Sequence, residues 1–235
     1  MYVSTGTRAG DDGAMARALR HLKAKIISGE LSPGEQIRQE EMAEQIKVSR
    51  VPLREAMNVL ADQQLLVHRP HQGYFVSKRA PHEHVQIRKM LHLLENELMS
   101  TITWPDSEGL ASLSALNSRM STSARAGDIE TLIELNRQFH FRIFSLSPHN
   151  LILQEVGRLW AMAEPAMWSK FEQPEHRERT LAEHDALLVA LAHRDRQRCI
   201  QELERHRNSV AAGGIPWPAA PTDLPPMSPR PARSD

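Results

Sequence analysis

The sequence predicts a mainly α protein in which an N-terminal winged helix-turn-helix precedes a C-terminal all-α helical bundle. Two patterns support this prediction. Residues 14–79 carry three short helical segments and then a hairpin-like segment, which is the element order of a winged helix-turn-helix. Residues 80–212 show helical periodicity almost throughout, as a helical bundle requires.

The first helix is expected to begin at Ala14. Leu22 and Ile26 occupy apolar positions at helical spacing, and Gly29 stands where a helix commonly ends in a left-handed residue. The preceding residues 1–13 are rich in Gly, Ser, Thr and Asp, so we expect them to form a flexible N-terminus.

A second helix is expected over residues 39–46, and a third begins directly after Ser49. Ser49 is a favourable N-cap residue, and Pro52 lies in the first turn, where a missing N–H group does no harm. Apolar residues then recur on one face of the third helix, namely Leu53, Ala56, Met57 and Leu60.

Two short apolar runs after the third helix predict a β-hairpin. Residues 65–67 and 74–76 are strand-like, and the segment between them contains Pro70 and Gly73. A hairpin at this point completes a winged helix-turn-helix, a motif whose second helix enters the major groove of DNA.

Six further helices are expected in the C-terminal part, over residues 82–101, 107–126, 128–145, 151–171, 180–193 and 195–211. The segment from Thr180 to Glu183 has a capping-box pattern, which predicts a helix start just before His184. The last segment, residues 213–235, carries seven prolines and few aliphatic residues, and we expect this tail to be disordered.

The composition favours a cytoplasmic protein without a membrane partner. The single cysteine, Cys199, excludes an intrachain disulfide and suits a reducing compartment. No apolar run approaches the roughly 18 residues of a membrane span, and the N-terminus lacks the pattern of a secretory signal. The charge balance is neutral, with 29 basic and 29 acidic residues, so it does not by itself favour nucleic acid.

Two arginines near the start of the third helix are candidate DNA contacts. Arg50 and Arg54 are four residues apart and therefore share one face of the helix. An arginine in this position grips phosphate or reads guanine bidentately, and the hydroxyl of Ser49 is a further candidate phosphate contact. The alternative is that both arginines are ordinary solvated charges. In the hairpin, Arg69, His71 and Gly73 are weaker candidates for DNA contact, and Gly73 is expected to adopt a positive φ.

Three segments together resemble the N-terminal domain of the GntR family of bacterial repressors. They are Gly29-Glu-Leu-Ser-Pro-Gly34, Ser49-Arg-Val-Pro-Leu-Arg-Glu-Ala56 with Leu60, and Gln72-Gly-Tyr-Phe-Val76. The resemblance implies that the helix after Ser49 is the recognition helix. It also implies that Gly73 lies at the tip of a wing that approaches the minor groove.

Four polar residues from three predicted helices form a candidate metal site. His140 follows Asn136 by one helical turn, so both side chains project from one face. His184 and His206 lie at similar separations from a corner at Arg194, on antiparallel helices, so we expect them side by side. Three imidazoles and one oxygen donor suit a divalent metal, with zinc expected first and nickel, cobalt or manganese as alternatives.

The same segments resemble the FCD subgroup of the GntR family, whose FadR-like C-terminal domain has six or seven helices. The matching segments are 136–140, Glu183-His184 and Arg205-His206. The resemblance implies a metal held by one aspartate and three histidines, and Asn136 occupies the aspartate position. Since an amide oxygen brings no negative charge, it neutralises a divalent cation less well than a carboxylate.

The resemblance also implies an effector site for a small carboxylate metabolite. Arg88 matches an arginine that faces a carboxylate effector in the subgroup, and His92 stands where a glutamate is common. Asn150 matches an asparagine that often follows the first histidine. Arg88 is equally compatible with a solvated charge or a contact between subunits.

These observations predict a ligand-responsive transcriptional regulator, expected to be a repressor, that binds a pseudo-palindromic operator as a homodimer. The alternative is a metal-dependent hydrolase that uses the three histidines. Glu183 is a poor general base for that reaction, because it adjoins His184 and neighbouring helix positions point about 100° apart. A metal that only stabilises the scaffold is a third possibility. We expect no catalytic residues.

Overall fold

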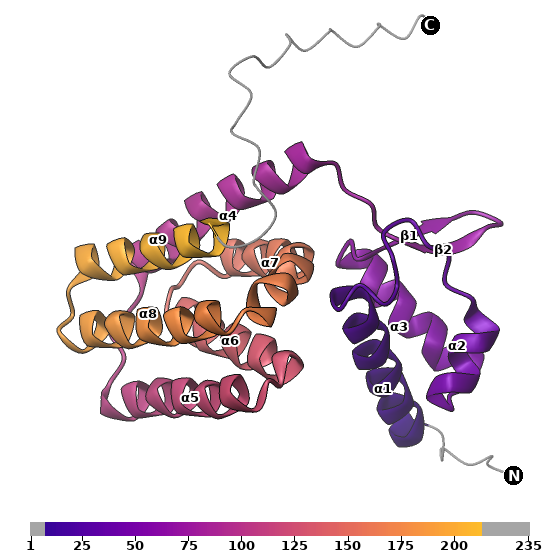
Figure 1. Cartoon of the computed structure of the whole chain (residues 1–235), viewed down its shortest axis with the longest axis horizontal. Coiled ribbons are helices and arrows are strands. Elements are labelled where there is room, and N and C mark those ends of the chain that lie inside the picture. The colour runs from indigo at the N-terminus through magenta and orange to yellow at the C-terminus, as the bar shows by residue number, and fades with distance from the viewer. Residues whose placement is uncertain (1–7, 213–235) are drawn as a thin grey trace, which may run out of the picture.

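The chain forms two units (Figure 1), and each has its own hydrophobic core. The computed structural model describes residues 8–212. The expected tail, residues 213–235, and the first seven residues of the expected flexible N-terminus lie outside the described residues. Within the described part, nine helices and a two-stranded sheet follow one another, so the mainly α fold class is confirmed.

The first core lies in an N-terminal unit of three helices and a hairpin. Its elements are α1 (Arg8–Ile27), α2 (Gln39–Ile46), α3 (Arg50–Asp62), β1 (Leu66–Arg69) and β2 (Gly73–Val76). The apolar stripe of α3 packs against α1, and Leu53, Ala56, Met57 and Leu60 are fully buried. The winged helix-turn-helix expected from the sequence is therefore present.

The turn between α2 and α3 aims the start of α3 outward. Lys47 ends α2 in the left-handed region with φ 57°, and Ser49 precedes α3 in an extended conformation. Ser49 thus occupies the N-cap position, but its hydroxyl makes no capping hydrogen bond. Because the hydroxyl is exposed, it is available to a group from outside the chain.

The wing is an antiparallel hairpin whose register pairs Leu66 with Val76 and Arg69 with Gly73. His71 and Gly73 both have positive φ, at 61° and 91°, which folds the connection tightly. The inner side of the hairpin joins the first core through buried Leu66 and Val76.

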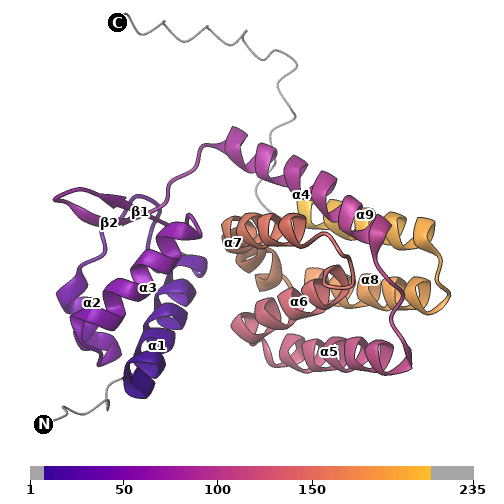
Figure 2. The same cartoon turned by 180° about the vertical axis from the view of Figure 1, so that it is seen from behind.

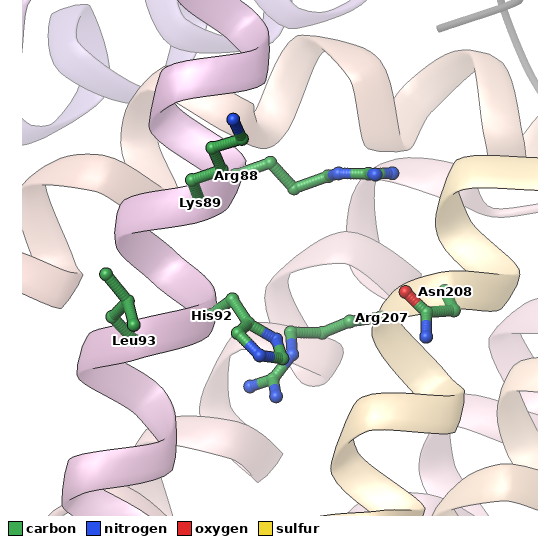
Figure 3. A pocket seen from close by; sticks show the side chains of 6 residues that line it. All are labelled: Arg88, Lys89, His92, Leu93, Arg207 and Asn208. Atoms are coloured by element: carbon green, nitrogen blue, oxygen red, sulfur yellow. The ribbon is translucent and has the colours of Figure 1, made fainter. Parts of the chain in front are cut away.

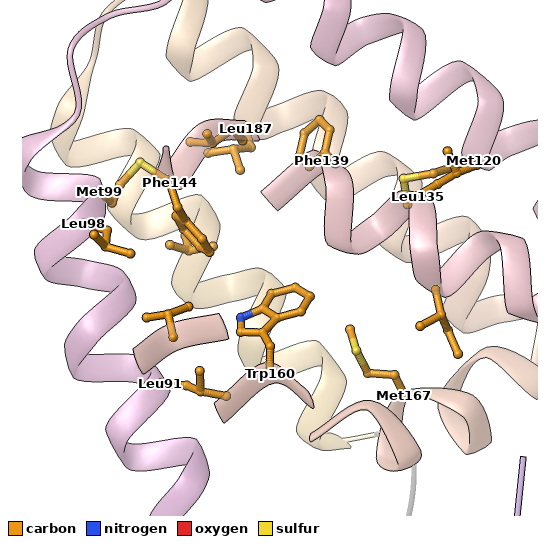
Figure 4. Packing of buried hydrophobic residues seen from close by; sticks show 14 of the residues in the cluster. Leu91, Leu98, Met99, Met120, Leu135, Phe139, Phe144, Trp160, Met167 and Leu187 are labelled. Carbon is orange, nitrogen blue, oxygen red and sulfur yellow. The ribbon is translucent and has the colours of Figure 1, made fainter. Parts of the chain in front are cut away.

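The second core lies in a bundle of six helices, seen from opposite sides in Figures 1 and 2. These are α4 (Pro81–Thr101), α5 (Ser107–Ala126), α6 (Ile129–Phe144), α7 (Asn150–Glu172), α8 (Pro174–Ala192) and α9 (Arg196–Ala212). Large side chains from α4, α6, α7 and α8 meet at its centre, among them Phe139, Phe144 and Trp160 (Figure 4). Asp106 and Asp128 cap α5 and α6 by accepting hydrogen bonds from backbone N–H groups.

The predicted start of α8 at the Thr180 capping box is wrong. The helix begins at Pro174, six residues earlier, because proline is favoured in the first turn of a helix. Thr180 is 1% exposed, and its hydroxyl accepts a hydrogen bond from Lys170 Nζ at 3.0 Å. The residue therefore stabilises the packing of α8 on α7 and caps nothing.

The first helix also begins earlier than Ala14, at Arg8, and its C-terminal end lies beside α7. None of the helices described between residues 8 and 212 is long and apolar enough to span a membrane.

Candidate metal centre and nucleic-acid interface

Three histidines from three helices converge inside the bundle. His140 on α6 places its Nε2 atom 3.1 Å from Nε2 of His184 on α8 and 3.2 Å from Nε2 of His206 on α9. All three residues are at most 5% exposed, and one candidate ligand atom from each lies within 4.8 Å of the others. The structure therefore brings the three predicted histidines together.

The fold supports this convergence from two directions. The corner between α8 and α9, with Arg194 at φ 55°, turns the chain so that the two helices pack along each other. The ring of Phe139 stacks on His184 with centroids 4.2 Å apart, which restrains the imidazole.

The buried environment keeps all three imidazoles neutral. Burial lowers the pKa of His140 and His184 well below the ordinary value, and the other histidines add to the shift. Burial lowers the pKa of His206 to about 3, with the nearby cations Lys170 and Arg207 contributing. Neutral imidazoles keep a lone pair for a metal ion, so the protonation state suits ligation.

Glu183 orients one of these rings. Its Oε2 atom accepts a hydrogen bond from Nδ1 of His206 at 2.9 Å, which leaves the Nε2 lone pair of His206 facing the other two histidines. Carboxylates commonly play this part beside metal-binding histidines. The sequence indicates Glu183 as a capping-box residue and a poor general base, and it does not predict this contact.

Asn136 fits the position of an oxygen ligand. It lies one turn before His140 on α6 and is completely buried. Neither Oδ1 nor Nδ2 of Asn136 has a hydrogen-bond partner among the residues that the structure describes. A buried amide without a partner is unfavourable by about 1–3 kcal/mol, and coordination of a metal by Oδ1 would remove part of that cost.

A buried lysine lies behind the histidines and was not predicted. Lys170 on α7 is 1% exposed and donates to Thr180. Burial lowers its pKa to about 8, and the carboxylate of Glu183 opposes that shift. Lysine is almost never this buried. Its positive charge helps to lower the pKa of each of the three histidines.

A pocket of about 340 Å³ opens between α4 and α9. Its lining residues are Arg88, Lys89, His92, Leu93, Arg207 and Asn208. Arg88 and His92 extend from α4 on the side that faces α9 (Figure 3). The structure therefore brings two of the three predicted effector residues together. Asn150 is exposed at the first residue of α7 and does not line the pocket.

The pocket is connected to the histidine group through α9 and Trp160. Arg207, which follows His206, donates to the buried carboxylate of Glu95 at 2.9 Å and to Asn96 Oδ1 at 2.6 Å. Trp160 Nε1 donates to the same carboxylate at 2.6 Å, and its ring centroid lies 5.1 Å from that of His140. An anion in the pocket would therefore meet the guanidinium of Arg207, which a buried acid holds in place.

On the N-terminal unit, the predicted DNA contacts at the start of α3 are exposed. Arg50 Nη2 pairs with Glu40 Oε1 of α2 at 2.6 Å, with both side chains more than three-quarters exposed. Arg54 makes no ion pair or side-chain hydrogen bond within the described part of the chain. The sequence did not predict this partner of Arg50.

The wing presents the other three candidates. Arg69 and His71 are exposed, and the guanidinium of Arg69 lies 4.3 Å from the ring centroid of Phe75. A Cβ atom on Gly73 would meet only side-chain amides of Gln39 and Gln36, no closer than 3.6 Å, so its positive φ and not crowding favours glycine.

Comparisons with known proteins agree with this division. Residues 15–76 match the family described as bacterial regulatory proteins of the gntR family, and residues 86–209 match the FCD domain. The HTH-type transcriptional regulator McbR of Escherichia coli K12 is 28% identical over 183 residues, which cover 76% of this chain and 82% of that protein. The gluconate operon transcriptional repressor of Bacillus subtilis is 25% identical, over 83% of this chain and 82% of its own length.

Solved structures share the fold. The structure of E. coli McbR/YncC has a TM-score of 0.71 at 24% identity and covers 85% of this chain and 95% of its own. A GntR-type regulator from Rhodococcus sp. RHA1 has a TM-score of 0.67 at 19% identity, with 84% and 95% covered.

Proposed function

Because this chain belongs to the GntR family of transcriptional regulators and carries an FCD domain, we propose that it is a metal-containing repressor that responds to a small carboxylate. The observation that carries the proposal is the presence, in one chain, of an exposed arginine-bearing helix and a buried group of three histidines. The family is one of DNA-binding regulators and not of enzymes, so the hydrolase alternative is set aside.

DNA reading rests on the start of α3 and on the wing. Arg50 and Arg54 reach bases or phosphates of the major groove, and the exposed hydroxyl of Ser49 contacts phosphate. In the wing, Arg69 and His71 contact the backbone, and Gly73 permits a close approach to the minor groove.

A divalent metal, for which zinc is our first choice, would be held by His140, His184 and His206 with Asn136 as the oxygen donor. When bound, such an ion supplies a positive charge that attracts a carboxylate. The protein's own part is to hold the imidazoles neutral, to fix the His206 tautomer through Glu183 and to exclude water.

The effector is a small carboxylate that enters between α4 and α9. Arg88 and His92 line that pocket, and Arg207 adds a second guanidinium beside them. Asn150 does not line the pocket. We keep it as a candidate effector contact only if the effector also reaches the start of α7.

The regulator acts as a cytoplasmic homodimer on a pseudo-palindromic operator. A single recognition helix reads few bases, and two half-sites multiply the specificity. Effector binding would shift the relative placement of the two DNA-binding units and so change operator affinity. Repression is the direction that the gluconate operon repressor suggests by its name.

One experiment tests the proposal as a whole. Genomic fragments retained by the purified protein are sequenced, and one is used in gel-shift titrations with a panel of organic acids after metal analysis. We expect one shared palindrome, about one zinc per chain, and release of the DNA by at least one acid. If no DNA sequence is enriched, the proposal that the protein is a DNA-binding regulator is wrong. If the protein converts one of the acids into a product, the hydrolase hypothesis is supported instead.

A further inference from the structure

Helix α1 has two faces that serve different cores. Ala18, Leu22 and Ile26 recur every four residues and are buried in the core of the DNA-binding unit. Lys23 and Ile27 lie one residue further along and share a neighbouring face. Ile27 belongs to the hydrophobic core of the FCD bundle, so this helix is part of both units.

The same face of α1 carries an ion pair with a buried acid. Lys23 Nζ lies 2.7 Å from Oε2 of Glu164 on α7, and Glu164 is 1% exposed. A buried carboxylate is costly unless a cation compensates it, so this contact differs from an ordinary surface salt bridge. Glu164 thus favours a docked position of the DNA-binding unit.

Glu164 has a second cation from the bundle itself. Arg137 Nη1 on α6 lies 3.7 Å from Oε1 of Glu164, and its guanidinium stacks on the ring of Phe141 at 4.2 Å. Arg137 directly follows Asn136 and precedes His140 by three residues. A movement of α6 at the histidine site would therefore change the distance between Arg137 and Glu164.

We infer that Glu164 is a positioning residue that holds the DNA-binding unit through Lys23 and senses α6 through Arg137. The response of this contact to metal and its use in regulation rest on the proposed function, whereas the contact itself does not. In a dimer, a small change in the position of α1 alters the separation of two recognition helices, on which half-site binding depends.

The test measures the distance between the two units in the full chain without DNA. Gln45→Cys on α2 and Ala115→Cys on α5 place spin labels at exposed positions in the two units. The native Cys199 stays in place, because it is fully buried and burial raises the pKa of its thiol to about 11. Distance distributions are recorded by pulsed electron resonance in EDTA and with added Zn²⁺.

Lys23→Met is the central variant and Lys25→Met its matched control, because Lys25 lies on the same helix but pairs with Glu30 inside its own unit. The labelled chain is diluted with unlabelled chain so that most labelled dimers carry one labelled pair. We then expect a single narrow distance in the parent protein and in the control, and a broad distribution in Lys23→Met. Lys23→Arg, which keeps the positive charge beside Glu164, is expected to keep the narrow distance. An unchanged distribution in Lys23→Met would overturn the inference.

Arg137→Met tests the sensing step. The parent distance is expected to shift on addition of Zn²⁺, and Arg137→Met is expected to stay docked and lose that shift. A parent distance that ignores Zn²⁺, or an Arg137→Met variant that still shifts, would overturn this step. If the distances behave as expected while no operator is found, the positioning role stands and the proposed function fails.

Discussion

The carboxylate of Glu183 and the Nδ1 atom of His206 are joined by a hydrogen bond of 2.9 Å. Because the imidazole is neutral, this bond holds the proton on Nδ1 and leaves Nε2 without one. Nε2 of His206 lies 3.2 Å from Nε2 of His140, at the centre of the three-histidine group. A residue outside the predicted ligand set therefore decides which atom of His206 is available to a metal.

Replacement of this acid should weaken metal binding without unfolding the protein. Glu183→Gln is expected to reduce zinc affinity by about 10- to 100-fold, since the amide no longer fixes the tautomer. Competition with a chromophoric chelator measures the affinity. Glu178→Gln, an exposed change on the same helix, is the control and should bind zinc as the parent does. Equal affinities in both variants would remove Glu183 from the site.

Asn136→Asp should make the protein depend more strongly on metal. A buried carboxylate beside neutral histidines is uncompensated in EDTA, so the metal-free variant is expected to melt at a lower temperature than the parent. With zinc, the added charge should raise affinity by about tenfold or more, equivalent to about 1.4 kcal/mol. Thermal unfolding with and without zinc checks both effects. A variant whose melting shift matches that of the parent would show that Asn136 does not face the ion.

The metal-free protein should lose stability as the pH falls. The pKa values of the three histidines are depressed in the folded state, so the unfolded chain binds protons more readily below about pH 6.5. The loss continues toward the folded pKa of His206, about 3, with a slope of up to about 1.4 kcal/mol per pH unit for each histidine.

Denaturant titrations in EDTA between about pH 7.5 and pH 5 measure this slope. His184→Asn should flatten it, whereas His193→Gln, a change at an exposed position, should leave it as it is. A stability that stays level over this range would contradict the buried, neutral state of the group.

Arg54→Ala should weaken operator binding and leave the fold intact. The side chain is exposed, and a bidentate contact to a base contributes about 1–3 kcal/mol, so the dissociation constant is expected to rise about 5- to 150-fold. Gel-shift titration at fixed salt measures it. Arg119→Ala on α5 removes an exposed arginine from the bundle and should have no effect. If both proteins bind the operator as the parent does, α3 is not the reading helix.

Glu40→Gln should strengthen DNA binding. Its carboxylate pairs with Arg50, and an exposed pair of this kind adds little stability, about 0–1 kcal/mol. The change frees Arg50 and removes a negative charge near phosphate, so we expect affinity to rise by a few-fold with unchanged melting temperature. Glu44→Gln lies on the same helix and serves as control. A similar gain from Glu44→Gln would indicate a general charge effect and no competition for Arg50.

Local signals were sufficient for most of the fold. The apolar stripe of α3 and the left-handed residue after α5, Gly127, each determine structure within a few residues. The start of α8 was missed because two local signals competed. Pro174 began the helix, and Thr180 was engaged by a lysine from α7 that no local pattern identifies.

In the candidate site, too, some features follow from local sequence patterns and others depend on how the helices pack. The sequence predicted that the three histidines lie together. That prediction used helix spacing and the corner at Arg194, since antiparallel helices place residues equidistant from a corner side by side. The contacts of Glu183 with His206 and of Lys23 with Glu164 depend on how helices rotate and dock, which periodicity does not specify. Glu183 and His184 are neighbours on α8, so their side chains point in different directions. The side chain of Glu183 therefore reaches His206 on α9.

Helix α1 packs in both units, and this limits how readily the DNA-binding unit can be recombined with another receptor domain during evolution. A recombination that joins these DNA-reading helices to a foreign receptor would leave Ile27 uncovered and Lys23 without its acid. The boundary between the two units is therefore not defined by the linker alone, because Lys23 and Ile27 of α1 contact the helical bundle. Successful chimaeras would need to inherit the matching surface of α7 together with the first helix.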